Sequence, residues 1–318
     1  MKIEYTGVSN INGPLLTLDG VRGVAYDEMA EITMKNGQKR SGRVIMIDGE
    51  KVVLQVFEGT KGIALDNNSV SFEGHPMELA LSKEMLGRVF NGAGRPIDGL
   101  GELYPEEKRD VNGMAMNPVA RQYPRNCIYT GISAIDCMAT LIRGQKLPIF
   151  SGAGMSHNQL AAQIVRQAKV GESDEKFGIV FAGMGLKKDA ADFFKKDFED
   201  SSALQRVVMF INEASDPIIE RILTPRCALT AAEYLAFTYG MHILVIMTDM
   251  TAYCEALREF SSSKNEIPSR KGYPSYLYSD LASLYERAGM LEGVPGSVTQ
   301  VPILTMPNDD ITHPIPDL

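Results

Sequence analysis

A glycine-rich turn between an apolar run and a periodic helix is the first feature of the sequence that could do chemistry. It lies in residues 147–165, LPIFSGAGMSHNQLAAQIV. In the phosphate-loop motif G-x-x-x-x-G-K-[ST], backbone N–H groups cradle the phosphates, the lysine reaches the β and γ phosphates, and the hydroxyl holds Mg²⁺. Aligned on that motif, Ser151 and Ser156 replace the two glycines. His157 replaces the lysine, and Asn158 replaces the hydroxyl residue.

The pattern therefore predicts a phosphate loop in shape, with its charged group missing. The candidate nucleotide-binding residues of this degenerate loop are Gly152, Ala153, Gly154, Met155, Ser156, His157 and Asn158. Glycine-rich turns between a strand and a helix also occur for packing reasons alone. The turn by itself leaves both interpretations open.

A second candidate is the acidic residue at the end of the apolar segment HILVIMTDM. Asp249 lies where this predicted strand ends, and the carboxyl ends of parallel strands form the edge at which ligands bind. In phosphoryl-transfer sites, an acidic residue at this position holds Mg²⁺ directly or through water. Aspartate also caps helices, and a helix is predicted to begin near Met250. Spacing alone does not separate these two roles.

The composition excludes several other classes of function. A chain of 318 residues with 44% hydrophobic and 23% charged residues is typical of an ordinary globular protein with two domains. The net charge of -8 disfavours a nucleic-acid partner. The four cysteines form no C-x-x-C pair, and no metal site is predicted from them. No stretch approaches the length of a membrane span, so we expect a cytoplasmic or peripheral protein.

The elements that must position these residues divide the chain into three parts. Residues 1–75 alternate apolar and polar positions between Asn-Gly and Asp-Gly turns, which predicts a small antiparallel β-barrel. Residues 76–125 are rich in glycine, proline and charge, which predicts a connector with short elements rather than a core.

From residue 126 to residue 318, apolar runs alternate with amphipathic segments, which predicts an α/β domain with a mostly parallel sheet. The predicted strands are residues 146–151, 177–184, 206–214, 242–249 and 297–306. The predicted helices are residues 157–170, 188–200, 217–240 and 250–263. The last segment, NDDITHPIPDL, is predicted to be a surface loop, because it is rich in proline and aspartate.

Beyond these patterns, essentially the whole chain resembles the beta chains of the vacuolar and archaeal-type (V/A-type) rotary ATPases and ATP synthases. The resemblance is carried by residues 131–168, 220–259 and 272–318, and by the shorter segments FEGT, GRVFNGAGRPIDG and MNPVAR. It implies a β-barrel, then a RecA-like nucleotide-binding domain of the phosphate-loop NTPase type. It also implies a C-terminal helical domain that we expect to be missing from these 318 residues.

The resemblance also implies a regulatory chain that does not catalyse hydrolysis, and no catalytic residue is assigned. Catalytic relatives carry a lysine where this chain has His157, whose side chain is mostly neutral at pH 7. They carry a water-positioning glutamate where this chain has Leu186. Asn158 offers Mg²⁺ only a carbonyl oxygen. We expect Mg-ATP to bind this loop weakly.

As partners, the resemblance implies three catalytic A subunits alternating with three copies of this chain in a hexameric ring. Central-stalk and peripheral-stalk subunits would complete the complex, through which alone the chain would meet a membrane. No cofactor is expected to bind tightly, while ATP or ADP with Mg²⁺ could bind at subunit interfaces. The candidate interface residues are Arg226, Arg258, Arg270, Tyr276 and Arg287. Each arginine could instead be a solvated or salt-bridged helix residue, and the tyrosine could simply pack a helix.

Two other functions remain open at this point. One is an active RecA-like ATPase or helicase with an unusual loop, against which His157 and Leu186 count. The other is a nucleotide sensor that works without a ring.

Overall fold

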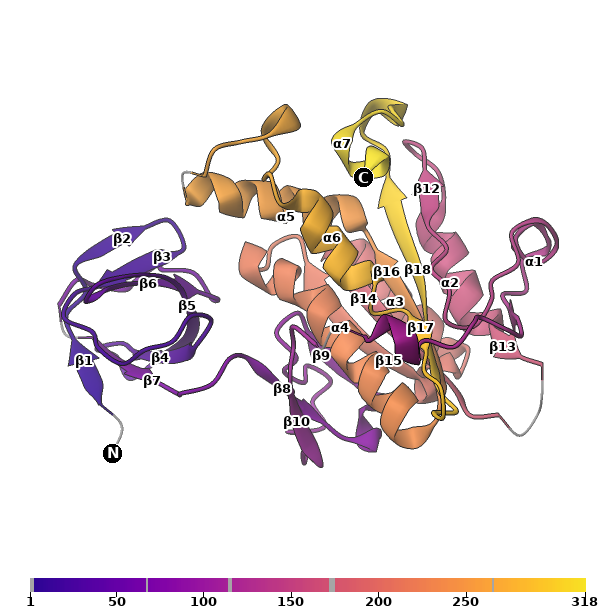
Figure 1. Ribbon diagram of the computed structural model, residues 1–318, viewed down its shortest axis with the longest axis horizontal. Helices are drawn as coiled ribbons and strands as arrows, with labels where there is room; N and C mark the ends of the chain where they lie inside the picture. Colours follow the sequence, from indigo (N-terminus) through magenta and orange to yellow (C-terminus); the bar gives the residue numbers. More distant parts are fainter. Residues whose placement is uncertain (1–2, 67, 114–115, 172–174, 265) are drawn as a thin grey trace. The chain divides into compact units, whose positions relative to one another are not determined.

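The computed structural model describes residues 3–66, 68–113, 116–171, 175–264 and 266–318 (Figure 1). The chain divides into two compact units. The smaller unit comprises Met1–Glu78, Pro217–Glu220 and Glu259–Glu266, and the larger comprises Leu79–Asp216, Arg221–Arg258 and Ile267–Leu318. In the part of the chain that the structure describes, no helix combines the length and the apolar character needed to cross a membrane.

The smaller unit contains an antiparallel sheet of seven strands in the order β1-β7-β4-β5-β6-β3-β2. The strands are β1 (Glu4–Thr6), β2 (Asn10–Asn12), β3 (Leu15–Leu18), β4 (Met29–Thr33), β5 (Lys39–Asp48), β6 (Lys51–Val56) and β7 (Ser69–Phe72). Leu16, Ile32 and Leu54 are fully buried inside it. Gly37 and Gly49, both with positive φ, lie in the β4–β5 and β5–β6 turns. The predicted barrel and its two hairpins are confirmed.

The segment that follows the barrel contains short elements. They are β8 (Glu78–Leu81), the 3₁₀ turn η1 (Lys83–Met85), β9 (Val89–Asn91), β10 (Glu107–Asp110) and η2 (Pro118–Ala120). The prediction of a connector without core residues is wrong for β9, which pairs in parallel with β15 at the edge of the main sheet. Phe90 is 1% exposed and stacks on Phe210 with the ring centroids 5.3 Å apart. The sequence pattern did not predict this strand, because it has only three residues and lies between segments rich in glycine and charged residues.

The main sheet of the larger unit has the order β12-β18-β16-β14-β15-β9, and β17 pairs with β18 at one side. Its strands include β12 (Ile149–Ser151), β14 (Phe177–Leu186), β15 (Val207–Glu213), β16 (His242–Thr248), β17 (Gly289–Met290) and β18 (Ser297–Thr305). All neighbouring pairs are parallel except β17 with β18. Strands covered on both faces bury every side chain, so they read as continuous apolar runs. The predicted parallel sheet is confirmed.

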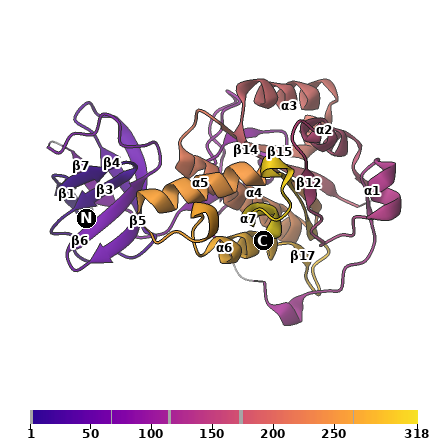
Figure 2. The same ribbon diagram turned by 90° about the horizontal axis from the view of Figure 1, so that it is seen from above.

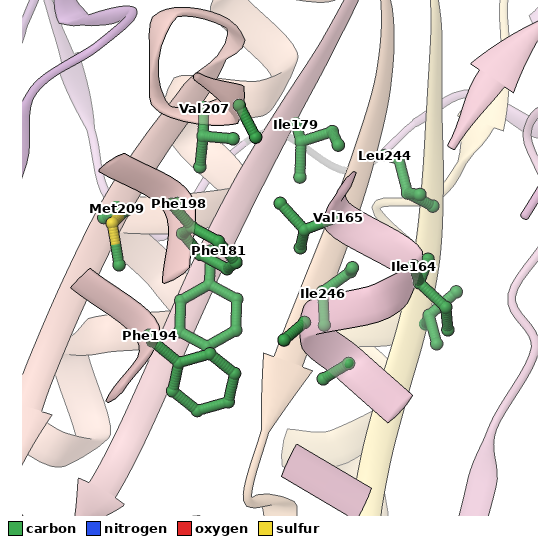
Figure 3. Packing of buried hydrophobic residues seen from close by; sticks show 14 of the residues in the cluster. Ile164, Val165, Ile179, Phe181, Phe194, Phe198, Val207, Met209, Leu244 and Ile246 are labelled. Atoms are coloured by element: carbon green, nitrogen blue, oxygen red, sulfur yellow. The ribbon is translucent and has the colours of Figure 1, made fainter. Parts of the chain in front are cut away.

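Helices cover both faces of this sheet. The helices in the described part of the larger unit and its border are α1 (Ser133–Met138), α2 (His157–Gln167), α3 (Lys188–Asp200), α4 (Ile218–Tyr239), α5 (Met250–Ser263), α6 (Leu277–Tyr285) and α7 (Pro314–Asp317), with 3₁₀ turns η3 (Ala203–Arg206), η4 (Arg270–Gly272) and η5 (Pro307–Asp309). Figure 2 shows α2 and α3 on one face of the sheet and α4 and α6 on the other. Phe194 and Phe198 of α3 pack on Phe181 of β14, with ring centroids 4.5 and 5.5 Å away (Figure 3).

Two predictions about element ends are wrong. The helix predicted over residues 157–170 ends at Gln167, because β13 (Lys169–Val170) pairs with β11 (Ile128–Tyr129). The C-terminal segment, predicted as a surface loop, contains η5 and α7 and buries His313 and Ile315. Pro314 stands at the first position of α7, where its fixed φ suits a helix start and its missing N–H costs no hydrogen bond.

A buried ion pair connects α4 with the residues that follow α6. The guanidinium of Arg287, whose side chain is 5% exposed, donates to both carboxylate oxygens of Glu233 at 2.6 and 2.7 Å. It also donates to the carbonyl of Val111 at 3.0 Å and to Thr230 Oγ1 at 2.8 Å. Because these partners come from α4 and from the connector, this one side chain joins three segments.

Replacing Arg287 with Met should lower the free energy of unfolding by about 3–5 kcal/mol, because the Glu233 carboxylate would be left buried without its partner. Arg22→Met is the control, because Arg22 pairs with Glu50 at the surface, where the two side chains are 79% and 53% exposed. That change should cost less than about 1 kcal/mol. Urea unfolding followed by circular dichroism measures both. Equal losses in the two variants would contradict the role assigned to Arg287.

Candidate functional site

The glycine-rich turn has the predicted strand–turn–helix geometry. Strand β12 ends at Ser151, and α2 begins at His157. Gly154, with φ of 75°, adopts the left-handed conformation that glycine tolerates without strain. Four side chains on one face of α2, all fully buried, fix the helix on the sheet: Ala161, Ala162, Ile164 and Val165. This packing places the loop at the carboxyl edge of the sheet.

Asp249 lies at the same edge and acts as a helix cap. Its Oδ1 accepts hydrogen bonds from the N–H of Thr251 in the first turn of α5 at 2.9 Å and from the N–H of Thr305 at 3.1 Å. Thr251 Oγ1 in turn donates to the carbonyl of Thr305 at 2.6 Å. Thr305 is the register partner of Ser151. The edge thus brings the loop and Asp249 together through β18, while one oxygen of the carboxylate is already engaged by two N–H groups.

The two residues that replace the lysine and the hydroxyl residue of the motif are His157 and Asn158. Nδ1 of the half-buried His157 lies 3.3 Å from Ser151 Oγ and 3.2 Å from the carbonyl of Met155. The Oδ1 of Asn158 is buried and accepts no hydrogen bond from the described part of the chain. A carbonyl oxygen in this position offers Mg²⁺ a weak ligand without the charge of a carboxylate.

A carboxylate that the sequence analysis missed lies against the loop. The N–H of Ala153 donates to Asp309 Oδ1 at 2.6 Å. A Cβ atom added to Gly152 would lie 3.0 Å from the same oxygen, so the carboxylate also lies close to the preceding residue. Asp309 was predicted to lie in a surface loop. An acidic residue shortly after a strand that neighbours β12 is the signal that could have identified it, because such residues gather at one edge of a parallel sheet.

Leu186, which is predicted to replace the water-positioning glutamate of catalytic relatives, is buried and apolar. Leu186 ends β14, is 6% exposed and packs back toward its own strand, since a Cβ on Gly183 would lie 2.5 Å from Leu186 Cδ1. Asn212, fully buried at the end of β15, accepts hydrogen bonds from the N–H of Gly185 at 3.1 Å and from Arg221 Nε at 3.0 Å. Sequence patterns gave no indication of this polar pair.

The segment carrying Asp309 is fixed by its own polar contacts. Burial, and after it the neighbouring Lys271 ammonium, lowers the pKa of His313, so the ring is neutral at pH 7. Its Nδ1 then accepts a hydrogen bond from the N–H of Ile315 at 3.4 Å. Hydrogen bonds from the Thr312 hydroxyl and N–H lower the pKa of Asp310.

The candidate interface residues fall into two groups. Arg226 donates to Asp280 at 2.6 Å with its side chain 15% exposed, and Arg287 is buried in its ion pair with Glu233. Their donors are used inside the larger unit, and a role of these two arginines at an interface stays a prediction. The salt-bridged alternative describes them.

The other three candidates lie nearer the surface. Arg258 pairs with Glu255, and Arg270 donates to Asp317 at 2.7 Å, both with largely exposed side chains. Tyr276 is half-buried at the start of α6. Their role at an interface stays a prediction.

The residues at this edge do not fit a bound Mg-triphosphate. No lysine or arginine belongs to residues 151–158. One N–H of the loop is taken by Asp309, and Asp249 has one oxygen engaged by backbone N–H groups. A cavity of about 620 Å³ lies elsewhere, lined by Arg109, Met116 and Phe237 among others, and none of its lining residues belongs to the loop.

Comparison with known proteins agrees with this architecture. Residues 8–74 match the beta-barrel domain of the ATP synthase alpha/beta family, and residues 131–318 match its nucleotide-binding domain. The V-type ATP synthase beta chain 2 of Clostridium tetani (strain Massachusetts / E88) is 65% identical over 320 residues, covering 100% of this chain and 70% of the relative.

The V-type ATP synthase beta chain of Halothermothrix orenii (strain H 168 / OCM 544 / DSM 9562) is 64% identical over 315 residues, covering 99% of this chain and 68% of the relative. Both identities extend along essentially the whole chain. The chain therefore belongs to the ATP synthase alpha/beta family, among its V-type beta chains.

Proposed function

We propose that this chain is the non-catalytic, regulatory subunit of a V-type ATPase or ATP synthase. The observation that carries the proposal is the phosphate loop, which keeps the strand–turn–helix shape without the groups that act on a triphosphate. His157 and Asn158 replace the lysine and the hydroxyl, and a carboxylate is bonded to the N–H of Ala153.

The end of β14 supports the same proposal. A buried leucine at position 186 cannot orient or deprotonate water. General acid–base assistance typically contributes about 10²–10⁴-fold to a rate, and stabilisation of transition-state charge by a cation contributes further. Without either group at this loop, the chain lacks a route to hydrolysis of its own.

The proposed role is to alternate with three catalytic subunits in a hexameric ring and to contribute residues to nucleotide sites at their interfaces. Stalk subunits would join the ring to the membrane part, where proton or sodium transport takes place. When two chains share a binding site, nucleotide binding there changes the free energies of the conformational states of both chains. Different nucleotide affinities in the different states of the ring would then couple hydrolysis to rotation. Relatives that are named V-type ATP synthase beta chains support membership in such a complex.

The purified chain alone should hydrolyse Mg-ATP at far less than about 1 per second, the lower end of ordinary enzyme turnover. A coupled assay for released ADP measures the rate. The control is the same preparation mixed with a partner chain that carries an intact G-x-x-x-x-G-K-T loop, in which hydrolysis is expected. Turnover above about 1 per second by the chain alone would support an active ATPase instead.

Restoring the motif by the double change His157→Lys and Asn158→Thr should strengthen Mg-ATP binding about tenfold to a hundredfold. A hydrogen bond to a charged group contributes about 1.5–3 kcal/mol, which corresponds to that range. His157→Gln is the control, because it changes the ring without adding a charge. Hydrolysis should stay undetectable in all variants, because Leu186 is unchanged. Equilibrium dialysis with labelled ATP measures the affinity, and equal binding by all variants would contradict the assignment of this loop.

Native mass spectrometry of the chain mixed with such a catalytic partner should give a complex of three copies of each. The interface candidates Arg258 and Arg270 provide variants, and replacing either with Ala should weaken assembly. Asp192→Asn, a change on the exposed side of α3, is the control. A chain that binds nucleotide but assembles with no such partner would support the stand-alone sensor.

A further inference from the structure

We propose that Asp309 is an intramolecular anion bound to the phosphate loop, and that it determines the low affinity of the loop for anionic ligands. The inference rests on the proposed function, because it takes the loop as the phosphate-facing part of the nucleotide site. It adds a cause that the missing lysine does not include. The loop has no lysine or arginine. In addition, the Asp309 carboxylate occupies the N–H of Ala153.

The contact has the character of an anion site. The N–H of Ala153 donates to Asp309 Oδ1 at 2.6 Å, and hydrogen bonds from a backbone N–H to a carboxylate are among the stronger ones in proteins. Gly152 allows the approach, because any side chain there would begin 3.0 Å from the same oxygen. In a phosphate loop, backbone N–H groups of this turn bind phosphate oxygens. A carboxylate oxygen therefore stands where a phosphate oxygen would be bound.

The backbone turns sharply to bring Asp309 to the loop. The N–H of Met306 first donates to the carbonyl of Ser151 at 2.8 Å, which continues the β12–β18 pairing. Asn308 and Asp309 then adopt φ values of 56° and 55°. Asparagine and aspartate tolerate this left-handed conformation better than most residues, so their side-chain types suit the turn.

Contacts from η4 and the residue after it fix the rest of the segment. Arg270 Nη1 donates to Asp317 at 2.7 Å, and Arg270 also donates to the carbonyl of Thr312. Lys271 Nζ lies 3.4 Å from Asp310 Oδ2. The ring of Tyr273 packs edge-on against His313 with centroids 5.7 Å apart. The segment is thus held at several points and does not depend on Asp309 for its position.

These contacts make the effect on ligands predictable. A phosphate that enters the loop must displace the carboxylate from the N–H of Ala153 and then lie next to its negative charge. Like charges at short range repel, and salt screens that repulsion when the groups are exposed, as Asp309 is. The penalty should therefore rise with the charge of the ligand, from adenosine, which has none, to ATP.

The test compares Asp309→Asn, Asp309→Ala and the control Asp192→Asn, which removes one exposed aspartate of α3 and leaves the loop unchanged. Asparagine keeps an oxygen that can accept from the N–H of Ala153 and removes only the charge. The Asp309→Asn variant therefore tests the charge even if Asp309→Ala disturbs the fold. Equilibrium dialysis with ATP, inorganic pyrophosphate and adenosine at low salt gives the affinities. At low salt, both Asp309 variants should bind ATP and pyrophosphate about tenfold more tightly than the unchanged chain does. At 0.5 M salt this gain in affinity should fall to about threefold, because salt screens the repulsion. Adenosine binding and Asp192→Asn should show no change.

A structural readout accompanies the affinities. Amide hydrogen exchange at Ala153 should accelerate in Asp309→Ala, because its acceptor has gone, and should stay slow in Asp192→Asn. Unchanged exchange and unchanged ATP affinity in the Asp309 variants would overturn the inference.

The doubly restored loop with His157→Lys and Asn158→Thr separates the two proposals. If it gains affinity while the Asp309 variants do not, the loop remains a nucleotide site and only the role of Asp309 is rejected. If neither gains affinity, both the role of Asp309 and the assignment of the loop are rejected.

Discussion

The parallel pairing of β12, β18 and β16 is the constraint on which the candidate site depends. Ser151 pairs with Thr305, and Thr248 pairs with Ile303, so the three strands end at the same edge. Asp249 then reaches the N–H of Thr305, as the first residue after β16. A shift of one residue in this register would turn every side chain of a strand to the opposite face and separate these groups. The strand register therefore decides which side chains meet at the candidate site.

This dependence explains how the shape of a phosphate loop persists without its charge. The loop conformation is set by the end of β12 and by the buried face of α2, whose apolar side chains pack on the sheet. His157 and Asn158 are not among the apolar residues of that cluster. The groups that act on a phosphate can therefore change while the strand, turn and helix stay the same. Conversely, the geometry of such a loop is weak evidence that it binds a triphosphate.

Two arginines of the larger unit form ion pairs within that unit. Arg226 and Arg287 both have carboxylate partners from another segment of the same unit, Asp280 and Glu233. Desolvation of a buried pair offsets much of its attraction, so the pair contributes more to keeping segments in place than to net stability. Removing one member leaves the other charge unpaired. Such residues therefore help to hold the segments of the larger unit together.

The sequence by itself determined the barrel, the order of strands and helices, the glycine-rich turn and the position of Asp249 after a strand. These features depend on residues that are close together in the chain, where apolar periodicity, turn residues and β propensity act locally. It missed β9, because three residues between glycine and charged segments carry too little pattern. It also left open whether Asp249 caps a helix, which its bond to the N–H of Thr251 answered.

Only the tertiary structure decided which side chain contacts the glycine-rich loop and which arginines form ion pairs within the larger unit. Asp309 and Ala153 are 156 residues apart, and Arg287 and Val111 are 176 residues apart. No local pattern encodes such a contact, because it exists only when the strands between the two residues have been placed in order and register. The sequence determined that residues 151–158 contain no lysine or arginine, and the folded chain decided that the Asp309 carboxylate contacts the N–H of Ala153.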